Sequence, residues 1–79
     1  MEISYDKKYN IAYIKILEKT SKVETIMLSA EVNIDISPDG RIYGIELLNA
    51  NDQLKLKNNE LIFIDTLTGR KIKIPFGLN

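Results

Sequence analysis

The chain has 79 residues, 44% of them hydrophobic, which suits one small globular domain and is too apolar for a disordered segment. It contains no cysteine and no histidine, which excludes disulfides, thiolate zinc sites and the usual base near neutral pH. Eleven basic and eleven acidic residues cancel, which argues against binding to nucleic acid or to anionic membranes. Because no apolar run approaches the roughly 20 residues of a membrane span and the N-terminus lacks a signal-peptide pattern, we expect a cytoplasmic protein.

The first part of the chain has the pattern of short antiparallel strands. Residues 2–5 and 11–17 are rich in β-forming side chains and are separated by the polar residues 6–10, so the two segments are expected to form a hairpin. A solvated loop at 18–22 then precedes a third expected strand at 23–28.

The central stretch predicts a strand, a tight turn and a second strand. Residues 32–36 alternate apolar and polar side chains with a period of two, as a half-buried strand does. Pro38-Asp39-Gly40 is a turn sequence. Residues 42–48 are apolar on both faces, which is typical of a strand that is central in a sheet or covered on both sides. Gly44 inside this strand predicts a bulge or a close approach by another backbone.

The C-terminal part predicts further hairpins. Residues 53–57 alternate, and Asn58-Asn59 fits a two-residue turn leading to a strand at 61–65. Thr68-Gly69 then turns the chain into a last strand at 70–76, in which lysines and a proline share one side.

Eight strands are therefore expected, with one alternative. Residues 50–57 also fit one or two helical turns capped by Asn49 or Asn51. The predicted fold is all-β, built mainly from antiparallel hairpins that form a curled sheet, a small sandwich or a barrel. We expect residues 1–79 to be a single β-rich domain.

Two sequence blocks carry a resemblance to a known family. The first is Tyr5-Asp6 followed by Tyr13-Ile14, and the second is V-N-I-D at 32–35 followed by D-G-R-I-Y-G-I-E-L-L at 39–48. In these blocks the chain resembles small bacterial and archaeal proteins known only as a domain of unknown function. The resemblance covers residues 1–50 and leaves 51–79 as C-terminal hairpins outside the pattern. It implies a β-sheet fold, no established activity, and a similarity to partners encoded beside toxin-like genes.

Four polar residues are the candidate functional positions: Asp6, Asn10, Asp35 and Glu46. Asp35 and Glu46 are expected on adjacent strands, where two carboxylates can share acid–base work. Asn10 stands where the resembling family often has Asp. The spacing of the polar residues from Asp35 to Glu46 approximates that of a calcium-binding loop. Such a loop lies between two helices, whereas the segments on both sides here alternate with a period of two, as strands do. No metal site and no cofactor are therefore expected.

Excess apolar surface favours an interaction protein. Three segments are apolar on both faces: residues 11–17, 42–48 and 61–64. The chain therefore either folds over itself or is covered by a second copy. We expect a non-catalytic protein-interaction module, homodimeric, and antitoxin-like or an accessory subunit that binds a protein encoded nearby. The expected contact surface contains Tyr9, Tyr43 and Phe76. The alternative is a small enzyme, or a ligand- or metal-binding protein, that uses surface carboxylates.

Overall fold

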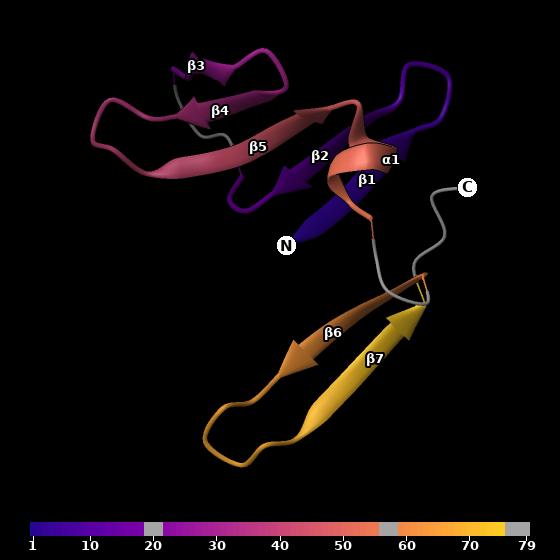
Figure 1. Ribbon diagram of the computed structural model, residues 1–79. Coiled ribbons are helices and arrows are strands. Elements are labelled where there is room, and N and C mark those ends of the chain that lie inside the picture. Colours follow the sequence, from indigo (N-terminus) through magenta and orange to yellow (C-terminus); the bar gives the residue numbers. More distant parts are fainter. Residues whose placement is uncertain (19–21, 56–58, 76–79) are drawn as a thin grey trace.

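The computed structural model describes residues 1–18, 22–55 and 59–75, and these form two antiparallel sheets and one short helix (Figure 1). The elements in chain order are β1 (Glu2–Asp6), β2 (Ile11–Lys15), β3 (Glu24–Ser29), β4 (Val32–Ile36), β5 (Ile42–Leu48), α1 (Ala50–Gln53), β6 (Glu60–Ile64) and β7 (Lys71–Pro75). The all-β prediction is confirmed, and the five-stranded sheet is open instead of closed into a barrel.

The five-stranded sheet has the order β1-β2-β5-β4-β3. Its two wings, β1–β2 and β3–β4–β5, are each built from strands that follow one another along the chain. The pairing of β2 with β5 joins the wings and places β5 in the middle of the sheet. The central position predicted for residues 42–48 is therefore confirmed.

One row of isoleucines crosses all five strands on a single face. The register places Ile3, Ile14, Ile45, Ile34 and Ile26 opposite one another from β1 to β3. We call these five residues the isoleucine row. The neighbouring row on the same face consists of Tyr5, Ala12, Leu47 and Val32. Together the nine side chains form what we call the apolar face of the sheet.

The apolar face is not covered to the degree expected of a hydrophobic core. Four members of the isoleucine row are only half-buried, and Ile26 is 40% exposed. Across the described residues, the hydrophobic residues that reach full burial are Ala12, Tyr43 and Ala50. Since Ile45 has strands on both sides and is still half-buried, the described part of the chain lacks a second layer over the row.

The helix α1 corrects the strand that was predicted for residues 53–57. Gln53 closes the helix and Leu54 lies in a turn, so the alternative of a helical turn near residue 50 is the right one, whereas residues 56–57 lie outside the described residues. Asn49 occupies the N-cap position, but with φ 52° and no side-chain cap hydrogen bond. The described residues therefore contain seven strands, where eight were expected for the chain. No helix in the described ranges is long and apolar enough to cross a membrane.

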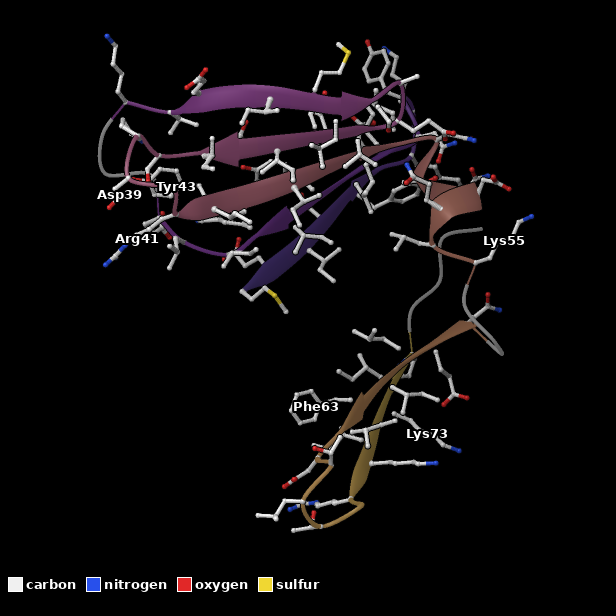
Figure 2. All side chains as sticks on the ribbon, turned by 60° about the vertical axis from the view of Figure 1, so that its left-hand side comes forward. Asp39, Arg41, Tyr43, Lys55, Phe63 and Lys73 are labelled. Carbon is white, nitrogen blue, oxygen red and sulfur yellow. The ribbon has the colours of Figure 1, made fainter. Side chains whose placement is uncertain are left out.

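Strands β6 and β7 form a hairpin that lies apart from the five-stranded sheet in both views (Figures 1 and 2). The turn between them contains Gly69 at φ 76°, as the Thr68-Gly69 prediction requires, and Asp65 Oδ1 accepts hydrogen bonds from Leu67 N and Thr68 N. One hairpin replaces the plural C-terminal hairpins that were expected. The Asn58-Asn59 turn cannot be compared in full because residue 58 lies outside the described residues, although Asn59 has φ 55°.

Candidate functional site

The face opposite the isoleucine row carries ordered polar side chains. By register, Tyr13, Glu46 and Asn33 lie side by side on β2, β5 and β4. The next row on this face includes Gly44 and Asp35. We call this side of the sheet the polar face. It contains two of the four candidate functional residues, Asp35 and Glu46.

Tyr13 reaches across β5 to a carboxylate on β4. Its hydroxyl donates a hydrogen bond of 2.8 Å to Asp35 Oδ2. The ring passes directly over Gly44, where an added Cβ would lie 2.2 Å from the Tyr13 hydroxyl oxygen. Gly44 is not among the positive-φ glycines, so this close approach, and not the backbone conformation, is what requires a glycine. The predicted approach by another backbone is wrong, because the close neighbour is a tyrosine side chain. The predicted bulge is present beside Gly44, at the register shift between Asp35 and Ile36.

Asp35 and Glu46 each accept hydrogen bonds from neighbours on the sheet. Asp35 Oδ1 accepts a 2.7 Å bond from the Thr25 hydroxyl on β3, in addition to the bond from Tyr13. Glu46 Oε1 accepts a 2.9 Å bond from Asn33 Nδ2. Since Asp35 pairs with Gly44 and Glu46 pairs with Asn33, the two carboxylates are offset along the strands instead of directly opposed.

Neighbouring side chains hold the carboxylates of the polar face in fixed orientations. Both Asp35 oxygens accept bonds from hydroxyls, and Glu46 Oε1 accepts one from Asn33. Since a carboxylate oxygen has two lone pairs, each of these oxygens keeps the capacity to accept a further hydrogen bond. Among the described residues, no group of three His, Cys, Asp or Glu side chains is placed to hold a metal ion. The polar face therefore presents oriented hydrogen-bond acceptors.

Asp6 shapes the turn between β1 and β2. Its Oδ1 accepts hydrogen bonds from Lys8 N at 2.9 Å and Tyr9 N at 3.2 Å. An aspartate that bonds to backbone amides two and three residues ahead is a common turn former. The contacts of this candidate residue are therefore those of a local structural group.

Asn10 links the start of α1 to the β1–β2 turn through side-chain and backbone hydrogen bonds. Its Oδ1 accepts bonds from the Tyr5 hydroxyl at 2.9 Å and from Asn51 N at 3.0 Å. Its Nδ2 donates to Asn51 Oδ1 at 2.7 Å and to Asn49 Oδ1 at 3.2 Å. Its backbone carbonyl accepts a 3.0 Å bond from Ala50 N. Asn10 also has φ 57°, a left-handed conformation that asparagine tolerates better than most residues.

The expected contact residues have different surroundings. Tyr9 is 63% exposed, and Lys8 Nζ lies 5.2 Å from the centre of its ring. Tyr43 was expected to be exposed, and this is wrong, because only 6% of it is accessible. The chain after β2 lies against it, since Ile16 N and Leu17 N both donate to Tyr43 O. Phe76 lies outside the described residues.

The turn between β4 and β5 holds a carboxylate with an altered acidity. Hydrogen bonds from the Ser37 hydroxyl and from Arg41 N to Asp39 lower the pKa of that carboxyl below its usual range. Gly40 completes the turn with φ 91° and donates its N–H to Ser37 O at 3.0 Å. The predicted Pro38-Asp39-Gly40 turn is thus present, and Asp39 belongs to its internal bonding.

Sequence reasoning missed Thr25, Asn33, Asn49 and Asn51, all of which bond to candidate residues. Asn33 had a signal, because it alternates with apolar residues on the same predicted strand as Asp35. Thr25 had none, since its contact depends on the register between β3 and β4.

In the described residues, the fold is that of a small antiparallel β protein whose main sheet carries the isoleucine row on one side. The other side carries hydrogen-bonded polar side chains beside the apolar Ile11, Leu48 and Met27. Residues 2–51 match the family described as "Protein of unknown function (DUF2283)", and the chain belongs to that family. The match confirms the resemblance seen in the sequence. It runs from β1 into α1 and ends before the β6–β7 hairpin. Searches of curated proteins and of solved structures found no match.

Proposed function

We propose that this protein is a non-catalytic interaction module that works as a homodimer. The observation that carries the proposal is the apolar face, on which the isoleucine row crosses five strands without being fully buried. Sheets with one apolar side gain stability by burying that side against another layer. A second copy of the chain provides that layer in a symmetric dimer.

The exposed area supports this proposal. The chain exposes 6166 Å², about 1,300 Å² more than the roughly 4,900 Å² typical of a folded monomer of 9.0 kDa. Its radius of gyration is 14.3 Å, against about 12 Å for a compact chain of this length. A standard protein interface removes roughly 800 Å² from each partner, and obligate dimers remove more. The excess area is therefore the amount that a stable dimer buries.

The polar face supports recognition of a second protein in the same way. Once the apolar face is paired, the polar face is the broad surface that remains for a different partner. Its carboxylates are held by Tyr13, Thr25 and Asn33, so they present fixed hydrogen-bonding groups to a binding protein. An antitoxin-like or accessory subunit would use such a surface to bind a protein encoded nearby.

The test is the oligomeric state, with two neighbouring variants on β3. Ile26 belongs to the apolar face, while Met27 points to the polar face and is 74% exposed. Light scattering across a concentration series should give twice the 9.0 kDa mass of one chain for the wild type and for Met27→Glu. Ile26→Glu should weaken the dimer by at least ~30-fold, because it places a charge in an apolar interface. A wild type that stays monomeric at high concentration contradicts the proposal, and so does equal weakening by both variants.

A further inference from the structure

We infer that the β6–β7 hairpin of each chain packs on the isoleucine row of a second copy, so that two chains exchange hairpins. The inference rests on the proposed homodimer and specifies which segment covers the apolar face. It concerns the part of the chain that lies beyond the family match, which ends at residue 51.

The hairpin has an apolar side of its own that nothing in the described chain buries. The register pairs Leu61 with Ile74 and Phe63 with Ile72, which places these four side chains on one side. Phe63 is 61% exposed, and Ile72 and Ile74 are also exposed. An isolated two-stranded hairpin is at best marginally stable in water. The hairpin therefore needs a second apolar surface to pack against.

Charge also favours contact between the hairpin segment and the sheet. Residues 1–53 contain nine acidic and six basic side chains, whereas residues 59–75 contain two acidic and three basic ones. The two parts therefore carry net charges of −3 and +1. On the hairpin, Lys71 and Lys73 lie on the side opposite Phe63, so they remain in solvent when the apolar side is packed. Opposite net charges steer two such surfaces together.

The path of the chain favours a second copy as the partner. Asn10 ties the start of α1 to the β1–β2 turn, and Gln53 Nε2 donates to Glu31 O at 2.9 Å in the β3–β4 turn, so the helix is fixed at the ends of the strands of its own sheet. Beyond this fixed point, the hairpin extends away from that sheet in both views (Figures 1 and 2). Contacts between strands are concentrated within the five-stranded sheet and within the hairpin.

The exchange buries both apolar surfaces through two equivalent contacts that the symmetry of the dimer relates. In a two-fold dimer, each chain gives its hairpin and receives its partner's, so the same surfaces are buried twice. Packed sheets lie about 10 Å apart, a spacing that side chains of the size of isoleucine and phenylalanine fill. The arrangement also supplies the second layer that the isoleucine row lacks.

Cross-linking tests the exchange directly, because the chain has no cysteine of its own. Full-length Ile34→Cys and Phe63→Cys are purified separately, refolded together and treated with a short bismaleimide. We expect a covalent product of two chains that contains one of each variant. Met27→Cys replaces Ile34→Cys in the matched control, and because residue 27 faces the polar side it should give little product. Ile26→Cys serves as a second position on the row if Ile34→Cys does not fold.

Four results would overturn the exchange. Cross-linking within one chain of an Ile34→Cys/Phe63→Cys double variant, without two-chain product in the mixture, would show that the hairpin packs on its own sheet. Equal product from the Met27→Cys control would show that the contact is not specific to the row. Finally, we expect Phe63→Glu to weaken the dimer at least ~30-fold. A Phe63→Glu dimer of unchanged affinity overturns the exchange but leaves the proposed homodimer standing, whereas a monomeric wild type removes both.

Discussion

Replacing Gly44 with alanine should destabilise the protein through the side chain of Tyr13. The new Cβ would lie 2.2 Å from the Tyr13 hydroxyl oxygen and 2.4 Å from the ring carbon that bears it. No such contact is tolerated, so the ring must move and its hydrogen bond to Asp35 is lost. A hydrogen bond to a charged group contributes about 1.5–3 kcal/mol. Alanine offsets part of this loss, because glycine in a strand costs roughly 0.5–1 kcal/mol relative to alanine.

The net expectation for Gly44→Ala is a loss of about 0.5–2.5 kcal/mol. For a domain of this size, that corresponds to a fall in Tm of roughly 2–20 °C. The assay is urea and thermal unfolding followed by circular dichroism at one fixed protein concentration, because the apparent stability of a self-associating protein depends on its concentration. Gly40→Ala is the control, because Gly40 has φ 91° and no atom within 4 Å of its added Cβ. Its cost arises from backbone strain alone.

A double-mutant cycle with Tyr13→Ala decides between the ring and the backbone as the cause. Once the ring is absent, Gly44→Ala should be neutral or stabilising by up to about 1 kcal/mol. The cost of Gly40→Ala should be the same with and without the ring. If Gly44→Ala is equally destabilising in the Tyr13→Ala background, the close approach does not explain the glycine and the reasoning is refuted.

Three further predictions concern single polar side chains. Asn10→Ala should lower the free energy of unfolding by about 1–3 kcal/mol in thermal unfolding. It removes the side-chain hydrogen bonds to Tyr5 and α1 and places alanine at φ 57°. Asn10→Gly should recover only the part of this loss that comes from backbone strain. Folding lowers the pKa of Asp39, so the ionised carboxylate stabilises the folded protein. This stabilisation is fully present above the unfolded pKa of about 3.9 and is lost as the pH falls through the folded pKa. Urea unfolding from pH 6 to pH 2.5 should therefore show Asp39→Asn less stable than the wild type at pH 6 and equally stable at the acidic end. A difference in the free energy of unfolding that stays constant with pH would contradict this. Asp35→Asn should cost about 1–2 kcal/mol without changing the mass in light scattering, because the amide keeps only one acceptor oxygen for Tyr13 and Thr25.

The strands were predictable because alternation of side chains is a local property. Residues 32–36 and 42–48 alternate or are apolar throughout, and both became strands close to their predicted bounds. The pairing of β2 with β5 was not predictable, since alternation records which way a side chain points and not which strand lies beside it. Residues 50–53 form a helix because Asn10, some forty positions earlier, bonds to their backbone and side chains. A contact at that separation leaves no mark in a short window of sequence.

The site was predictable to the extent that its residues differ from their strand neighbours. Asp35 and Glu46 stood out as acids in apolar strands, and both proved to be hydrogen-bonded on one face. Their donors Thr25 and Asn33 were missed because the contacts depend on register. The expected exposure of Tyr43 was wrong, because only 6% of it is accessible. Its carbonyl accepts hydrogen bonds from Ile16 N and Leu17 N beyond the end of β2, and this path of the backbone does not show in the sequence.

The strand order of the main sheet also sets the sequence in which the sheet can assemble. Each wing needs only neighbouring segments, and hairpins of that kind close within microseconds. Joining β2 to β5 encloses both β3 and β4 in one loop, which is the entropically costly step of the sheet. The Tyr13–Asp35 hydrogen bond spans this junction, so it exists only in molecules whose wings have met. Tyr13 therefore stabilises the joined wings. A variant without the Tyr13 side chain should separate its wings faster, while each wing forms at an unchanged rate.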